Sequence, residues 1–277
     1  MRVLLATACA AMAGMTLGEA GRMSTTITVE DEIAVTECDQ LRIRFNDAAA
    51  QTAEEEISIA GSGRLQIDAA ENGGIHVEGW KEDRYLVKLC AAVPTGRGDR
   101  AREALGRIRL SEGEGRLSVS GPSSGEWIAH LIVRSPAGSE IVLKTDNGGI
   151  GLHDVDGRVD ARTENGPISL KGDAGDLRLE TENGPLEVAL AGSRWHGAGL
   201  TARTENGPIS LKLPSRYDSG LRVQASWHSP WSCRASQCDG ARKRWDDDSH
   251  LFELGEDPVI RLSTVNGPVS IEPGERD

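Results

Sequence analysis

The chain has 277 residues, a formal net charge of −12 at pH 7 and only 4% aromatic residues. This excess of acidic residues argues against nucleic acid or an anionic membrane as a partner, because both are bound by basic surfaces. The charge chiefly predicts solubility, and the length suits one large all-β domain or two small domains.

Residues 1–20 have the order of a secretory signal peptide. Arg2 is followed by an apolar, small-residue run to about Leu17, which is too short to span a bilayer. We therefore expect an exported protein, either periplasmic or extracellular, or associated with the outer envelope. Attachment as a lipoprotein through Cys9 is disfavoured, because only about six apolar residues precede that cysteine. No later run is apolar enough for a transmembrane segment in the mature chain.

Cleavage of the signal peptide would leave four cysteines, Cys38, Cys90, Cys233 and Cys238. An even number in an oxidising compartment indicates disulfides, and four cysteines allow three pairings. We favour Cys38–Cys90 and Cys233–Cys238. The first bridge would close a loop of about fifty residues, worth roughly 4 kcal/mol, whereas the second ties a local loop.

Residues 21–136 form the amino-terminal β part of the predicted fold. Short segments in which apolar and polar residues alternate recur through it, which indicates strands. They are "LRIRF" at Leu41, "EISIAGSGRLQID" from Glu56, "YLVKLC" from Tyr85, "RLSVSGP" from Arg116 and "WIAHLIV" from Trp127. One helical segment is expected from Asp99 to Leu105, ending at Gly106.

Residues 137–213 repeat a motif built on Asn-Gly, and residues 260–277 hold a last copy and a tail. The copies are "TDNGGIGL" at Thr145, "TENGPISL" at Thr163, "TENGPLEV" at Thr181, "TENGPISL" at Thr204 and "TVNGPVSI" at Thr264, with an outlying "AENGGIHV" at Ala70. The threonines are spaced by 18, 18, 23 and 60 residues. A fixed period of this size predicts a stacked repeat, in which the longer gaps hold insertions.

Within each copy, apolar and polar residues alternate on both sides of the motif, which predicts strands with one buried face. The same alternation places the Thr and Asn of each motif on the inward side. This set forms a predicted structural ladder of Thr145, Asn147, Thr163, Asn165, Thr181, Asn183, Thr204, Asn206, Thr264 and Asn266.

Two arrangements fit these strands, a parallel β-solenoid and an antiparallel meander with hairpins at Asn-Gly. Asn-Gly alone favours the hairpin, but proline follows at Pro167, Pro185, Pro208 and Pro268, where a two-residue hairpin needs an N–H. We therefore favour the solenoid, with Asn-Gly-Pro corners and the meander as the alternative. Equivalent residues would then stack about 4.8 Å apart, so that inward Thr and Asn could hydrogen-bond to their own copies.

Residues 214–259 interrupt the repeats and carry Trp227, Trp231, Trp245 and the second cysteine pair. We expect a lid or loop before the last copy. Its tryptophans could stack on a sugar or contact a partner, or they could anchor the lid to the repeats.

Several motifs together resemble the bacterial putative-adhesin family, catalogued as domain of unknown function 4097. They are "NGG" and "GW" near Gly73 and Trp80, the cysteine after "YLVKL", "SGP" before Trp127, the repeated "NGP", and "WHGAGL" before the fourth repeat. The resemblance covers about residues 36–213 and the last repeat. It implies an exported, β-solenoid-like envelope protein without established catalytic residues. The insertion after Leu213 departs from the compact repeat pattern.

Two clusters could bind metal ions. A column of Asp146, Glu164, Glu182 and Glu205 could recruit Ca²⁺, although the neighbouring Lys144, Arg162, Glu180 and Arg203 can neutralise it. A zinc site of His228, Cys233, Cys238 and His250 competes with the favoured disulfide. We expect neither cluster to bind a metal ion: the first should be a charge-compensated surface, and the cysteines of the second should form a disulfide.

The sequence contains no nucleophile elbow, phosphate-binding glycine loop or motif around a histidine. We therefore expect no cofactor and no enzymatic activity, and predict an adhesin or an envelope-associated binding or scaffold protein. Its partner would be a cell-surface glycan or an envelope protein. The alternative is a polysaccharide-binding or polysaccharide-cleaving β-helix protein, because the stacked columns supply many carboxylates.

Overall fold

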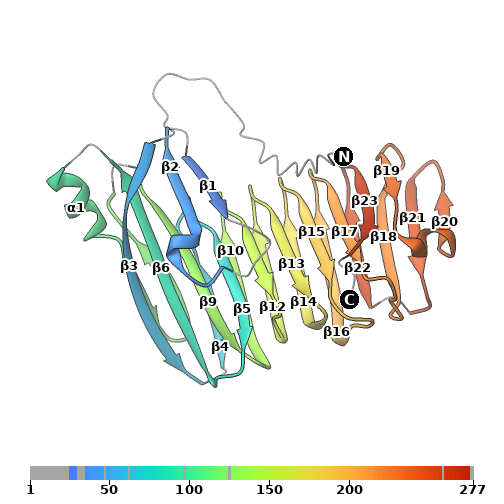
Figure 1. Ribbon diagram of the computed structural model, residues 1–277, viewed down its shortest axis with the longest axis horizontal. Coiled ribbons are helices and arrows are strands. Elements are labelled where there is room, and N and C mark those ends of the chain that lie inside the picture. Colours follow the sequence, from blue (N-terminus) through green and yellow to red (C-terminus); the bar gives the residue numbers. More distant parts are fainter. Residues whose placement is uncertain are drawn as a thin grey trace, which may run out of the picture.

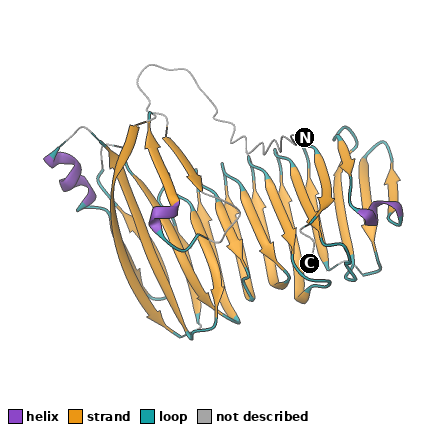
Figure 2. Cartoon of the chain, in the orientation of Figure 1, coloured by secondary structure: helices purple, strands orange, loops and turns teal. Residues whose placement is uncertain are grey.

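The computed structural model describes residues 25–29, 35–46, 48–61, 63–95, 98–123, 126–257 and 259–274. These residues form two large sheets, with one α-helix and two short 3-10 turns (Figures 1 and 2). The predicted signal peptide, residues 1–20, lies outside the described residues. Among the helices described, none has the length and hydropathy needed to cross a membrane.

The first sheet has twelve strands. In spatial order they are β1 (Thr25–Val29), β2 (Leu41–Phe45), β3 (Ala48–Ala60), β6 (Arg84–Pro94), β9 (Ile128–Pro136), β5 (Ile75–Trp80), β11 (Ile150–His153), β13 (Ile168–Gly172), β15 (Leu186–Leu190), β17 (Ile209–Leu213), β23 (Val269–Pro273) and β19 (Trp231–Cys233).

The second sheet has eleven strands. In spatial order they are β20 (Arg242–Trp245), β21 (Ser249–Leu254), β18 (Leu221–Ser226), β22 (Ile260–Thr264), β16 (His196–Thr204), β14 (Ala174–Thr181), β12 (Gly157–Thr163), β10 (Ser139–Thr145), β4 (Arg64–Asp68), β8 (Arg116–Ser120) and β7 (Arg109–Gly113).

The repeats alternate between the two sheets. β12 pairs in parallel with β14, which sets Thr163 opposite Thr181, and β13 pairs in parallel with β15, which sets Ile168 opposite Leu186. Each motif is therefore a bend that carries the chain from one sheet to the other. The antiparallel meander is wrong for these repeats, because their consecutive strands lie in different sheets.

The core lies between the two sheets. Alternating residues of each repeat strand are buried, as in β12, where Val159, Ala161 and Thr163 point inward and Arg158 and Arg162 are exposed. One continuous apolar cluster extends from Leu65 to Ile271. The period of two seen in the sequence is thus the alternation between core and solvent.

The amino-terminal part is built differently. β3, β6 and β9 are long and pair antiparallel. Helix α1 (Asp99–Leu105) lies where the sequence predicts it. It contacts β3 and β6, and its Ala101 and Leu105 are buried. At this end of the molecule the strands are visibly longer than in the repeats (Figure 1).

Residues 214–259 contain four strands, β18 to β21, and a 3-10 turn at Ser236–Asp239 rather than the expected loop. β18 pairs in parallel with β22, and β19 with β23. The segment therefore extends both sheets beyond the last repeat, so that β22 and β23 lie inside the stack. Its alternating Leu221, Val223 and Ala225 are buried like the repeat residues, which explains why it joins the sheet.

Candidate functional site

The threonines of the motif point into the core and are nearly fully buried. Thr163 Oγ1 donates to the carbonyl oxygen of Gly148 at 2.8 Å, and Thr181 Oγ1 donates to that of Gly166 at 2.9 Å. Thr145, Thr204 and Thr264 repeat this contact with the glycine of the neighbouring copy. The expectation that threonines bond to their own copies was wrong. Each hydroxyl instead satisfies a backbone carbonyl at the bend.

The asparagines form a ladder, but on the outside. Asn165 Nδ2 donates to Asn147 Oδ1, and Asn183 Nδ2 to Asn165 Oδ1, both at 3.0 Å. The ladder continues through Asn206 and Asn266 at 3.0 and 2.9 Å. All five side chains are exposed, so their predicted inward placement was wrong. The strands end at the threonine, and the alternation does not continue through the bend that follows.

The motif glycine is required because successive bends stack in close contact. A Cβ atom on Gly184 would lie 2.0 Å from the carbonyl oxygen of Gly166, and one on Gly207 would lie 1.9 Å from that of Gly184. The residues after Pro167, Pro185 and Pro208 donate to the proline carbonyl of the next copy, as Ile168 does to Pro185 at 2.9 Å. Because the donor is the residue after the proline, the missing N–H of the proline does not interrupt the backbone hydrogen bonds between copies.

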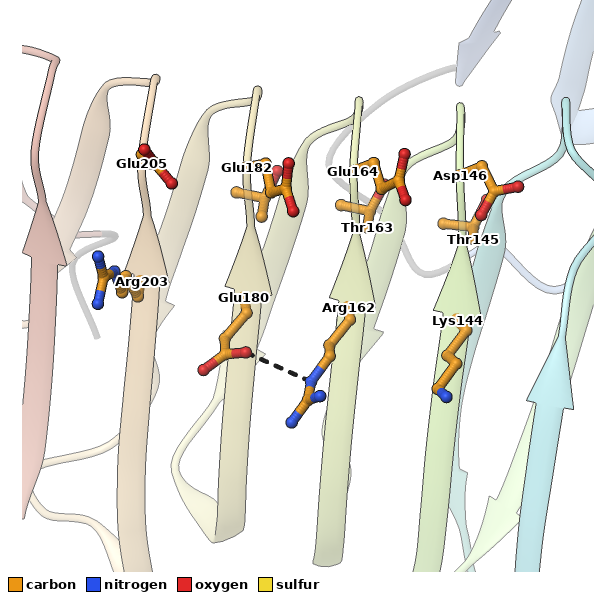
Figure 3. A pocket seen from close by; sticks show the side chains of 11 residues that line it. Lys144, Thr145, Asp146, Arg162, Thr163, Glu164, Glu180, Glu182, Arg203 and Glu205 are labelled. Carbon is orange, nitrogen blue, oxygen red and sulfur yellow. Dashed lines mark ion pairs between the residues drawn. The ribbon is translucent and has the colours of Figure 1, made fainter.

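An open groove of about 370 Å³ follows these bends along the outer face of the second sheet. Two rows of side chains line it, one on β10, β12, β14 and β16 and one in the bends that directly follow these strands (Figure 3). The acid row is Asp146, Glu164, Glu182 and Glu205, and the mixed row is Lys144, Arg162, Glu180 and Arg203. The structure thus brings together both columns identified in the sequence.

The two rows differ in their ion pairs. Arg162 Nε lies 3.3 Å from Glu180 Oε2 across the strands and 3.2 Å from Asp160 Oδ1 along its own strand. Arg178 Nη2 adds a contact of 2.5 Å to Glu180. Arg162 and Glu180 of the mixed row are therefore held by neighbouring side chains, whereas the acid row projects into solvent (Figure 3). At a strand spacing of about 4.8 Å, the acid row thus presents four carboxylates and the mixed row presents Lys, Arg, Glu and Arg.

Aromatic side chains close the carboxyl-terminal end of the core. Trp231 of the first sheet lies edge-on to Trp245 of the second, with ring centroids 5.1 Å apart, and stacks on Phe252 at 6.5 Å. Trp245 also meets His250 at 4.6 Å. A stacked repeat exposes the apolar face of its last layer, and these rings cover it. This geometry favours an anchoring role for Trp231 and Trp245.

Trp227 lies apart from this cluster, in the turn between β18 and β19. Its side chain is 58% exposed and its ring meets that of His228 edge-on at 5.4 Å. Trp245 keeps 48% exposure at the end of the stack. Of the three tryptophans singled out in the sequence, Trp227 has the ring face best placed to stack on a ligand.

The structure has the disulfides Cys38–Cys90 and Cys233–Cys238, with Cα separations of 5.5 and 6.0 Å. These are the pairs that the sequence analysis favours. Because Cys233 and Cys238 are joined, neither supplies the thiolate that a zinc site with His228 and His250 would need.

Sequence reasoning missed a histidine pair in the amino-terminal part. His76 Nδ1 and His130 Nε2 lie 2.6 Å apart on β5 and β9. No motif surrounds either residue, but the copies "AENGGIHV" and "TDNGGIGL" depart from the repeat by having Gly where later copies have Pro or Ser. That departure was the available signal.

No family model matches the chain, and the search of curated proteins finds no match. Among solved structures, a putative cell adhesion protein from Clostridium sporogenes is 12% identical, with a TM-score of 0.40, covering 82% of this chain and 100% of its own. A putative adhesin from Bacteroides fragilis is 10% identical, with a TM-score of 0.31 and coverages of 80% and 97%. A putative lipid binding protein from Parabacteroides distasonis is 11% identical, with a TM-score of 0.30 and coverages of 79% and 96%.

Proposed function

We propose that this chain is an exported, non-enzymatic β-solenoid protein of the bacterial envelope that binds a cell-surface glycan. The parallel pairing of successive copies supports the solenoid, and the two disulfides support export to an oxidising compartment. The family resemblance of the motifs supports the envelope role. In this proposal residues 21–136 and 137–213 are the body, 214–259 the end of the stack, and 260–277 the last repeat and tail.

The observation that carries the binding function is the open charged groove of the second sheet. Its carboxylates and guanidinium groups recur at one strand spacing, on a backbone that the core and the stacked bends hold fixed. A regular row of hydrogen-bonding groups suits an extended polymer with many hydroxyls better than a compact small molecule, which is bound in an enclosed pocket.

Trp227 supplies the second part of the proposal. A largely exposed indole ring offers an apolar face on which the C–H face of a sugar ring stacks. In the proposed function Trp227 contacts the glycan at the end of the stack, while Trp231 and Trp245 hold that end closed.

The test is binding of the labelled full chain to an array of bacterial and host surface polysaccharides. Glu164→Gln with Glu182→Gln keeps the shape of the groove but removes two charges, and Trp227→Ala removes the exposed ring. Each variant should weaken binding by about tenfold, equivalent to about 1.4 kcal/mol. Glu187→Gln, an exposed residue of β15 on the first sheet, is the matched control and should leave binding unchanged.

Retention of no polysaccharide would overturn the glycan proposal, and capture by envelope proteins alone would replace it with protein binding. Shortened products released from a polysaccharide, and abolished by one carboxylate substitution in the groove, would overturn the non-enzymatic proposal in favour of a polysaccharide-cleaving protein.

A further inference from the structure

His76 and His130 form a closely packed pair on the outer face of the first sheet. Their ring centroids are 4.8 Å apart, and the rings are tilted by 35°. His130 is 4% exposed. In the described part of the chain, the only hydrogen-bond contact of the two rings is the one between them, and His130 Nδ1 is buried without a partner.

The surrounding sequence makes room for the two rings. A Cβ atom on Gly74 would lie 2.6 Å from His130 Cε1, and one on Gly151 would lie 2.5 Å from His76 Cδ2. In the next copy the residue opposite Gly151 is Ser169. Two of the glycines that depart from the repeat, Gly74 and Gly151, thus lie beneath the histidines, so the pair occupies a place that the neighbouring strands leave open.

A separate apolar layer covers this part of the sheet. We call residues 35–46, with the 3-10 turn Cys38–Gln40 and β2, the amino-terminal cover. Its side chains pack on the outer face of β6 and β9. The second core thus formed contains Val35, Leu41, Ile43, Phe45, Cys90, Ala92, Ile128 and Ile132.

His130 lies within the footprint of the amino-terminal cover. Ile128 and Ile132, its neighbours on the same face of β9, both belong to the second core, and Cys90 is directly opposite His130 on β6. The disulfide from Cys90 to Cys38 tethers one end of the cover. At the other end, β2 pairs with β3 through two residue pairs. The cover is therefore tethered at both ends, and between them it is held by the apolar contacts of the second core, by the pairing of β2 with β1 and by the ion pair of Glu37 with Lys88.

Several charged groups surround the pair, and Glu54 of β3 shares its face, in register with Cys90 and His130. Lys88 is paired with Glu37 and Glu56, and Arg134 with Glu78 at 3.6 Å. The remaining charged residues on the packed elements are Glu54 and Glu55 of β3, Arg84 of β6, Asp39 of the 3-10 turn, the exposed Arg42 and Arg44 of β2, and His153 of β11. No carboxylate among the described residues accepts a hydrogen bond from either imidazole.

We propose that the His76–His130 pair is an acid-sensitive latch that holds the amino-terminal cover on the first sheet. With both rings neutral, one ring nitrogen donates and the other accepts. Protonating both rings leaves two donors facing each other and places two positive charges beside an apolar layer, which is costly without an anionic partner. Acid therefore favours the lifted cover, in which the rings are hydrated.

The pKa values agree in sign with this latch. Burial lowers the pKa of His76 from 6.5 to about 4. Burial and the neighbouring His76 hold the pKa of His130 well below its usual value. The lifted state then binds more protons than the closed state as the pH falls from 6.5 toward 4. The stability that the latch contributes is complete at neutral pH and is lost across that window.

The test is hydrogen exchange of the β2 amides in the full, disulfide-bonded chain, corrected for intrinsic exchange, at pH 7 and pH 4.5. Opening of β2 should increase by at least about tenfold on acidification, while the amides of β12 and β14 stay protected. In the double variant His76→Gln with His130→Leu, the pH dependence of β2 should nearly disappear. His153→Gln, on the same face but outside the second core, is the matched control and should behave as the wild type.

Imidazole ¹⁵N NMR on the wild type keeps the test independent of how the double variant folds. Two rings that resist protonation to below pH 5, and whose protonation coincides with exposure of β2, would support the latch. Ordinary titration near pH 6.5 with β2 protected throughout would overturn it, as would equal acid opening in the double variant.

Discussion

The repeat half and the amino-terminal half of the molecule are stabilised by different kinds of contact. In the repeats, the threonine hydroxyl and the asparagine amide at a bend bond to the neighbouring copy, through Thr163 to Gly148 or Asn183 to Asn165. In the amino-terminal half, a disulfide, a helix and a second apolar layer replace the missing repetition. Repetition thus stabilises through many equal contacts, whereas the other half depends on a few unlike ones.

The largest loss of stability in the repeat half should come from substituting a glycine of the Asn-Gly motif. Gly184→Ala places a Cβ atom 2.0 Å from the Gly166 carbonyl oxygen, and both groups are held by the stack. We expect a loss of more than about 4 kcal/mol in the free energy of unfolding, measured by urea denaturation. Gly113→Ala, where the added Cβ meets nothing within 4 Å, is the control. Equal losses in both variants would show that the bends do not stack closely.

The next effect tests the amino-terminal half. Replacing Cys38 and Cys90 by Ala removes a bridge between residues 52 apart, and the chain-entropy estimate gives a loss of about 4 kcal/mol. The same change at Cys233 and Cys238, five residues apart, should cost about 2 kcal/mol. Thermal unfolding of both variants measures the ratio. A larger loss at the second bridge would mean that the Cys233–Cys238 disulfide stabilises the end of the stack more than the aromatic rings do.

A smaller loss is expected at the buried threonines. Thr181→Val keeps the shape but leaves the Gly166 carbonyl oxygen without its donor, which should cost about 1 to 3 kcal/mol. Thr201→Val, an exposed residue of β16, serves as the control in the same denaturation series. If the two valine variants were equally stable, the inward hydroxyl would contribute nothing to the bend.

The smallest effect should come from the exposed asparagine ladder. Asn183→Ala removes two amide contacts that already face solvent, so we expect a loss below about 1 kcal/mol, similar to that of Glu182→Ala. A thermal shift assay compares them. A loss from Asn183→Ala as large as that from Thr181→Val would contradict the difference between the inner and outer ladders.

Much of the repeat half could be predicted because its pattern is periodic. Alternation in β12 and β14 gives the buried face, and the prolines exclude a hairpin at each bend. The placement of Asn165 could not be predicted from the same alternation, since β12 ends at Thr163 and the chain turns there.

The rest of the fold and the sites depends on contacts between segments that share no pattern. β18 lies beyond β22 although it precedes it in the chain, which spacing alone does not reveal. The closure of the core by Trp231 and Trp245 depends on that order. His76 and His130 are 54 residues apart, and only the glycines beside them mark the place.

The stacking of equivalent residues is the central claim, and NMR contacts between backbone protons test it most directly. In the full chain, the account predicts cross-peaks between β12 and β14 that set Thr163 opposite Thr181, together with a contact between the side-chain amides of Asn165 and Asn183. Cross-peaks that instead pair β12 with β13 as an antiparallel hairpin across residues 164–167 would contradict it.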